Sequence, residues 1–183
     1  ERAEGGSGGR PFPLPTVETE VEDGVAILTL NRPDQMNALS NRLLSDLESA
    51  WGRVEADPDV RAVILQGAGK AFMAGADLKF FSLALSSGEL GRVRQFTERA
   101  ADLYHRIDAS PKRVVVLLDG LSLGGGSELA LCADVIVATD RGSLGFPETG
   151  LGIYPGLGGT QRTTRRAGRP AGTMRMRESS GAR

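Results

Sequence analysis

Residues 119–140 read DGLSLGGGSELALCADVIVATD and place three consecutive glycines between an apolar run and a helix-forming run. The apolar residues at positions 114–118 predict a buried strand before this stretch, and residues 128–131 favour a helix within it. Glycine allows backbone N–H groups to approach a ligand without obstruction by a side chain. Free N–H groups and the positive dipole end of a helix favour negative charge, so this joint suits either an oxyanion or a phosphate.

The same alternation of strand and helix extends through most of the chain. Ser40 predicts the N-cap of a helix, and Asp57 and Pro58 predict its end. We expect a hairpin over residues 17–30 and buried strands at 60–65 and 114–118. Two helices are also expected. The apolar positions of the first are Leu44, Leu47, Trp51 and Val54, and those of the second are Val93, Phe96, Ala100, Leu103 and Ile107. This order predicts an α/β domain with a largely parallel sheet, and ligand groups at strand ends and helix starts.

Three segments are expected along the chain. Residues 1–15 are rich in glycine and then in proline, which is typical of a flexible linker, and residues 16–167 form the folded domain. Residues 168–183 belong to a basic ending with little apolar content, which carries arginines at positions 162, 165, 166, 169, 175, 177 and 183. Such a run is typical of a disordered tail, and a shifted reading frame, a truncation and nucleic-acid binding are the alternatives. The lack of interleaved aromatic side chains argues against nucleic acid.

Composition and charge exclude several classes of protein. With 22 basic and 23 acidic residues the net charge is −1, so no global field attracts a nucleic-acid backbone or an anionic membrane. No apolar run approaches the roughly 20 residues that cross a bilayer, and no apolar leader stands at the start. Cys132 and His105 are each the only residue of their type, which argues against disulfides and metal sites. We expect a soluble, cytoplasmic protein that binds no metal, nucleic acid or membrane.

Other chemistries of glycine-rich loops fit this sequence less well. It contains neither a GxxxxGK[ST] phosphate loop nor a GxGxxG fingerprint. Residues 125–129 nearly match the GxSxG elbow of serine hydrolases but fail at the last position, and nothing places His105 as its base. Glu128 and Glu148, by contrast, lie among apolar and glycine residues. A poorly solvated carboxyl has a raised proton affinity that suits acid–base chemistry, although an isolated glutamate more often marks a helix start or a solvated turn.

Four ordered segments within residues 25–166 resemble the enoyl-CoA hydratase/isomerase (crotonase) family. They are VAILTLNRPDQMNALS at 25–40, GKAFMAGADLKFF at 69–81, the stretch at 119–140, and LGFPETGLGIYPGLGGTQR at 144–162. The last looks most like bacterial enoyl-CoA hydratase domains, some of them fused to 3-hydroxyacyl-CoA dehydrogenases. The resemblance implies the crotonase ββα spiral and a lyase that reversibly adds water to a trans-2-enoyl-CoA in fatty-acid or related acyl-CoA degradation.

The resemblance also implies roles for individual residues. The backbone N–H groups of Ala76 and Gly125 match the pair that holds the thioester oxygen and stabilises enolate-like charge. Glu128 and Glu148 match the two family glutamates, the first helping a water attack the β-carbon and the second delivering a proton to the α-carbon. Both are expected to share that water, which would couple their protonation states. Coenzyme A enters as the thioester substrate, and no permanently bound cofactor is implied.

Five further positions are implied for the coenzyme A side. Backbone groups around Ala74, Asp77 and Leu78 match those that recognise the adenine, and Asn37 and Ala38 lie in the other coenzyme A segment of the family. For Asp77 the role of a helix N-cap is an equally good interpretation.

Family members normally continue for many tens of residues beyond GGTQR, with helices that close the acyl pocket and build a homotrimer or hexamer. We expect that C-terminal helical region to be missing from this chain. Isomerisation of a 3-enoyl-CoA is the nearest alternative activity. A truncated, non-catalytic remnant that binds coenzyme A or serves assembly is the alternative from a different class.

Overall fold

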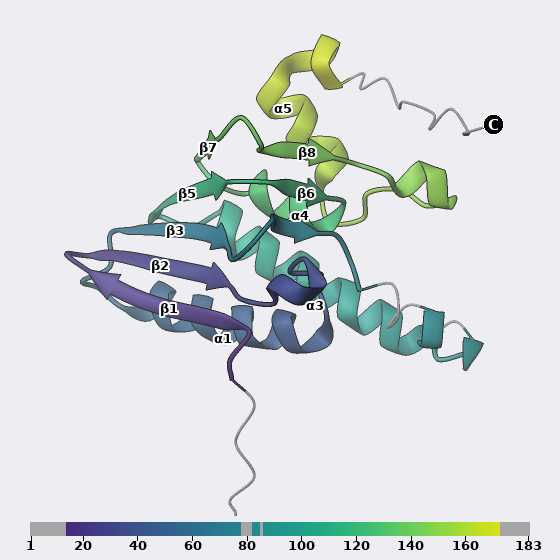
Figure 1. Cartoon of the computed structure of the whole chain (residues 1–183), viewed down its shortest axis with the longest axis horizontal. Helices are drawn as coiled ribbons and strands as arrows, with labels where there is room; N and C mark the ends of the chain where they lie inside the picture. The colour runs from purple at the N-terminus through teal and green to yellow at the C-terminus, as the bar shows by residue number, and fades with distance from the viewer. Residues whose placement is uncertain (1–13, 78–81, 85, 173–183) are drawn as a thin grey trace, which may run out of the picture.

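The computed structural model describes residues 14–77, 82–84 and 86–172, which fold into two β-sheets with helices packed against them (Figure 1). The larger sheet has the strand order β1-β2-β3-β5-β7. Its strands are β1 (Val17–Glu22), β2 (Val25–Leu30), β3 (Ala62–Gly67), β5 (Arg113–Leu118) and β7 (Val135–Ala138). Only β1 and β2 pair antiparallel in this sheet, so the predicted hairpin and the largely parallel sheet are confirmed.

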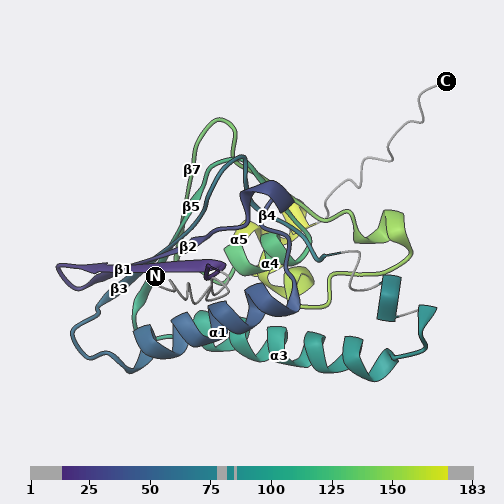
Figure 2. The same ribbon diagram turned by 60° about the horizontal axis from the view of Figure 1, so that its bottom comes forward.

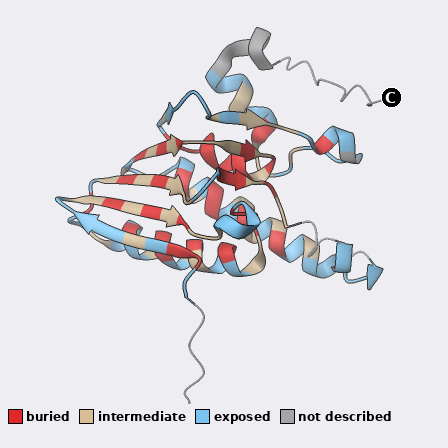
Figure 3. Cartoon of the chain, in the orientation of Figure 1, coloured by how far each residue is buried: buried red, intermediate tan, exposed pale blue. Residues whose placement is uncertain are grey.

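One face of the larger sheet forms the core of the domain. Side chains on β2, β3 and β5 alternate between buried and half-buried positions, as Figure 3 shows. Two helices, α1 (Asn41–Ala56) and α3 (Leu90–Asp108), lie side by side against the sheet (Figure 2). The Ser40 hydroxyl accepts the Leu43 N–H at 3.2 Å, which confirms the predicted N-cap. The apolar stripe predicted for α1 is buried at all four positions.

The smaller sheet was not predicted from the sequence. It contains β4 (Ala71–Ala74), β6 (Leu121–Leu123) and β8 (Ser143–Gly145) in the order β4-β6-β8, with both pairs parallel. These strands have three or four residues each, too few to show an alternating pattern. The short helix α4 (Gly125–Ala130) follows β6 directly, as the triple-glycine joint predicted.

Two 3-10 turns and a last helix are also among the described elements. The turns are η1 (Pro33–Gln35) and η2 (Glu148–Leu151), and the helix is α5 (Gly159–Gly172). Helix α5 runs past residue 167, where the sequence placed the end of the folded domain. Arginine, glutamine and alanine are good helix formers even where no apolar stripe reveals a helix. Most of the predicted linker and of the predicted tail lies outside the described residues, so those assignments stay predictions.

None of the helices in the described ranges combines the length and the apolar content that crossing a bilayer requires.

Candidate active site

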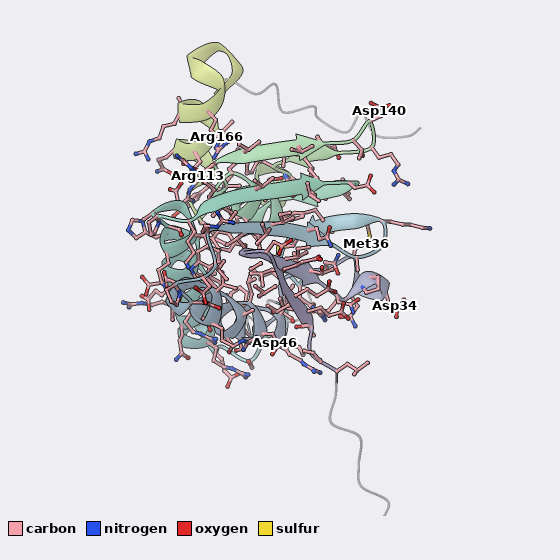
Figure 4. All side chains as sticks on the ribbon, turned by 90° about the vertical axis from the view of Figure 1, so that its left-hand side faces the viewer. Asp34, Met36, Asp46, Arg113, Asp140 and Arg166 are labelled. Carbon is pink, nitrogen blue, oxygen red and sulfur yellow. The ribbon has the colours of Figure 1, made fainter. Side chains whose placement is uncertain are left out.

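The carboxyl ends of the parallel strands bring the sequence-predicted residues to one edge. Ala76, Gly125 and Glu148 follow β4, β6 and β8 by two or three residues, and parallel strands end at the same edge of a sheet. The larger sheet has the same polarity: Figure 4 labels Arg113, which begins β5, on one side of the molecule and Asp140, which follows β7, on the other. The strand ends at which the sequence predicts ligand-binding residues therefore lie in one region.

The backbone around Ala76 fixes the direction of its amide. Leu39 and Ala76 form a parallel bridge in which the Leu39 N–H donates to the Gly75 carbonyl at 2.8 Å and the Asp77 N–H donates to the Leu39 carbonyl at 3.0 Å. In a parallel bridge, the residue whose two chain neighbours form the hydrogen bonds directs its own N–H away from the partner strand. Ala76 is that residue here. The Ala76 N–H therefore points away from Leu39, toward the side of β4 on which β6 lies.

Gly125 follows the strand that pairs with β4. Ala74 pairs with Leu123, and a Cβ built on Gly75 would stand 3.4 Å from the Leu123 carbonyl oxygen, so the backbones that lead to Ala76 and Gly125 run side by side. Gly124 turns the chain there with φ 48° and ψ −119°, a conformation that only glycine adopts without strain. Both Ala76 and Gly125 are half-buried.

Glu128 is held by backbone amides of the segment that follows η2. The residue lies on α4 and is 2% exposed. Its Oε1 accepts the Leu157 N–H at 2.7 Å and the Gly159 N–H at 2.8 Å. Two donors on one oxygen stabilise the carboxylate form and fix the orientation of the carboxyl group.

Glu148 approaches the same place from η2. It is 8% exposed, and a Cβ built on Gly124 would stand 2.7 Å from its Oε1. The carboxyl group therefore packs against the backbone immediately before Gly125. Within the part of the chain that the structure describes, Glu148 Oε2 is buried and has no hydrogen-bond partner.

Both carboxyl groups hold protons more tightly than a solvated glutamate does. Burial raises the pKa of Glu128, the amides of Gly159 and Leu157 oppose that shift, and repulsion from Glu148 raises the pKa further. Burial also raises the pKa of Glu148, against a hydrogen bond from its own backbone N–H. Glu148 packs against Gly124, whose carbonyl accepts the Glu128 N–H at 2.9 Å, so both glutamates lie at the same turn.

The competing chemistries find no support in the same region. Ser127 Oγ is buried between the carbonyl groups of Ser122 and Gly145, at 2.8 and 2.9 Å, which is a structural role. His105 is exposed on α3. Burial raises the pKa of the Cys132 thiol to about 12, so it is no nucleophile at neutral pH. Among the described residues no group of three or more histidine, cysteine, aspartate or glutamate side chains is placed to hold a metal ion.

The residues expected on the coenzyme A side flank this region. Ala74 and Asp77 donate their N–H groups to the carbonyl groups of Met36 and Leu39, both at 3.0 Å, and Arg32 pairs with the Asp77 carboxylate at 3.6 Å. Leu78 lies outside the described residues. Ala38 donates its N–H to Gln35 and accepts a hydrogen bond from the Arg32 guanidinium. A coenzyme A contact by any of these residues stays a prediction.

The side chain of Asn37 is fully occupied within the fold. It is completely buried, accepts the Arg32 N–H at 2.7 Å, and donates to the Ala68 and Ala71 carbonyl groups at 3.0 and 2.8 Å. Its φ of 54° is in the left-handed region, which asparagine tolerates better than most residues. The sequence did not reveal this bracing of the loop after β2, which leaves at most the Asn37 backbone for a ligand.

Replacing Asn37 by alanine is expected to lower the free energy of unfolding by about 2–4 kcal/mol. The change removes the partners of the part-buried Arg32 N–H and of the buried Ala71 carbonyl, and it strains a left-handed residue. Urea denaturation measures the loss. Asn37→Gly is the matched variant, because it removes the same hydrogen bonds without the backbone strain and should lose less. Wild-type stability in Asn37→Ala would contradict this role.

Comparison with known proteins places the chain in a family. Residues 20–178 match the family model for enoyl-CoA hydratase/isomerase. The chain belongs to this family. A solved enoyl-CoA hydratase from Bacillus anthracis superposes with a TM-score of 0.79 at 36% identity, over 86% of this chain and 60% of that one. The predicted crotonase-type fold is therefore confirmed.

Two relatives of this family carry names that describe a reaction. A crotonyl-CoA hydratase from Syntrophomonas wolfei is 42% identical over 81% of this chain and 56% of its own length. A short-chain-enoyl-CoA hydratase from Clostridium acetobutylicum is 39% identical over 85% of this chain and 58% of its own length. The chain thus spans a little over half the length of the relatives that it matches.

Proposed function

We propose that this crotonase-family chain catalyses the reversible addition of water to a trans-2-enoyl-CoA thioester. The observation that carries the proposal is the pair of buried carboxyl groups, Glu128 and Glu148, at the strand edge that also holds the amides of Ala76 and Gly125. The names of the hydratase relatives support the same reaction and the same class of substrate.

The surroundings of the two carboxyl groups differ. Burial raises the pKa of both, but Glu128 also accepts two amide N–H groups that oppose this rise, whereas Glu148 has one oxygen without a partner in the described structure. Pairs of groups with such different surroundings are typical of acid–base assignments. Glu128 therefore takes a proton from a water molecule as the water oxygen bonds to the β-carbon. Glu148 gives its own proton to the α-carbon.

The thioester oxygen gains negative charge as the water oxygen adds. The Ala76 amide is directed to the side of β4 on which β6 lies, and Gly125 follows β6, which supports donation by both amides to that oxygen. Fixed donors of this kind lower the barrier because they need no reorganisation during the reaction. The water then adds across the double bond without a redox step.

The proposal has three further parts, which concern coenzyme A binding, assembly and location. Coenzyme A contacts near Ala74, Asp77 and Asn37, a homotrimeric or hexameric assembly, and a cytoplasmic location are carried over from the resemblance to the family.

Addition of crotonyl-CoA is expected to give a decay of the absorbance of the conjugated thioester, with 3-hydroxybutyryl-CoA as the product. Chromatography of the products separates the reaction classes. A 3-enoyl-CoA that becomes conjugated, with no hydration of crotonyl-CoA, would favour the isomerase. Coenzyme A binding without any turnover would favour the non-catalytic remnant and contradict the proposal.

A further inference from the structure

The two amides that hold Glu128 belong to a segment with an unusual backbone. Leu157 and Gly159 both direct their N–H groups at Glu128 Oε1, and Gly158 between them has φ 99°. Glycine adopts a positive φ without the steric cost that a side chain would add, so it suits this position. A Cβ built on Gly158 would stand 2.2 Å from Arg162 Nη1, so the Arg162 side chain packs directly against this turn.

Arg162 anchors that turn to two helices. It lies in the first turns of α5, its Nη1 donates to the Leu157 carbonyl at 2.6 Å, and its Nε pairs with the Asp108 carboxylate at 3.1 Å. Asp108 is the last residue of α3. The Arg162 side chain is 11% exposed, which is low for a surface arginine. A guanidinium fork with two fixed acceptors orders both groups that it bridges.

The charge of Arg162 also acts on Glu128. Arg162 opposes the rise that burial causes in the pKa of Glu128, whereas Glu148 of η2 adds to it. Tyr104 of α3 and Cys132 also face this region, but burial raises the pKa of both, so they stay neutral at physiological pH. Asp108 is paired with Arg162. Arg162 is thus the cation in this set that favours the ionised base.

We propose that Arg162 is a positioning residue for Glu128: it holds the Leu157 carbonyl so that the Leu157 and Gly159 amides stay on Glu128 Oε1 and keep that carboxyl group ready to accept a proton. The inference rests on the proposed function for its kinetic consequence only. Arg162 does not touch the reacting atoms and acts through the loop and through its charge.

Amide NMR titration tests the proposal without turnover. The Leu157 and Gly159 amide signals should titrate with pH in the wild-type chain, and Glu128→Gln should abolish that titration. Arg162→Gln should move the midpoint to higher pH, because the favourable cation is lost. Asp108→Asn should move it to lower pH, because the Arg162 charge is then less compensated. The exposed Arg165 on the same helix gives the matched control, Arg165→Gln, which should leave the midpoint unchanged.

The kinetic arm uses the same variants with crotonyl-CoA. Arg162→Gln should lower kcat about tenfold with little change in KM, the loss expected for one hydrogen bond to a charged group. The acid limb of the rate profile should move with the NMR midpoint. Arg162→Lys keeps the charge without the fork and should recover most of the midpoint and part of kcat.

Each outcome decides the proposal. Amides that do not titrate, or a midpoint in Arg162→Gln equal to that of Arg165→Gln, would overturn it, as would a loss of kcat that Arg162→Lys does not lessen. If Arg162→Gln fails to fold, Arg162→Lys and Asp108→Asn supply the test through their midpoints. A wild-type chain that titrates as expected but hydrates nothing would count against the proposed function and not against this positioning.

Discussion

Glu128→Gln and Glu148→Gln are each expected to lower kcat for hydration of crotonyl-CoA by about 10³-fold, within the range found when one acid–base group is removed. Glutamine neither accepts a proton from the attacking water nor delivers one to the α-carbon. It retains an amide oxygen that can accept the Leu157 and Gly159 N–H groups, so Glu128→Gln should keep the local geometry. Stopped-flow or steady-state absorbance at saturating substrate measures the loss.

The stability of the same variants separates lost chemistry from lost folding. Burial raises the pKa of both carboxyl groups above that of the unfolded chain, so their contribution to stability is greatest at low pH and is lost as pH rises through the folded pKa. Glutamine does not ionise, and each variant should therefore be at least as stable as wild type at neutral pH. Thermal unfolding across the pH range measures this difference.

The exposed Glu20 on β1 provides the control, because Glu20→Gln removes an equal charge far from the strand-end region. It should leave kcat unchanged. Full activity in either Glu128→Gln or Glu148→Gln would contradict the two-carboxylate mechanism and favour a single acid–base group, as an isomerase would use.

The elements that the sequence predicted well are those with long-range periodicity. Helix α1 spans 16 residues, with apolar positions at three- and four-residue spacing, and Ser40 marks its start. Strands β2, β3 and β5 are mainly apolar runs with a glycine or proline at the end or within three residues after it. The four proposed catalytic positions could be named because motif order specified them, and three of them follow parallel strands that end at one edge.

The parts that the sequence missed depend on backbone groups and on tertiary contacts. β4, β6 and β8 are too short to show a pattern, so their sheet appears only when the chain is folded. The amides of Leu157 and Gly159 carry no side-chain signal for their role on Glu128. The glycine at 158 was visible as part of a glycine-rich joint, but its left-handed φ and its contact with Arg162 were not.

Asn37 and Tyr104 show the same limitation from the side of polar residues. Asn37 was carried over as a possible ligand contact, yet its side chain braces the loop after β2. Tyr104 was absent from the predicted apolar stripe of α3, and it is fully buried with its hydroxyl donating to the Gly125 carbonyl at 2.9 Å. A buried polar side chain forms hydrogen bonds with groups that are distant in sequence, and only the fold brings those groups within reach.

Gly125→Pro is expected to lower kcat by about 10²- to 10³-fold, the range found when one donor to a developing oxyanion is removed. Proline has no backbone N–H, and Gly125 is the first residue of α4, the helical position at which proline is best tolerated. Gly124 has ψ −119°, outside the helical region that a following proline disfavours. The substitution therefore removes one donor with little expected change in the backbone.

Gly125→Ala is the matched control for this donor. It keeps the amide, and a Cβ at this position would meet no atom closer than Leu157 Cδ1 at 3.6 Å, an ordinary contact. Alanine should therefore retain most of kcat while proline does not. A 3-ketoacyl-CoA resembles the enolate when it ionises and then places charge on the thioester oxygen, whereas coenzyme A does not. The Gly125→Pro substitution should therefore weaken binding of the 3-ketoacyl-CoA more than binding of coenzyme A. Equal kcat values for the proline and alanine variants would show that the Gly125 amide does not stabilise that charge.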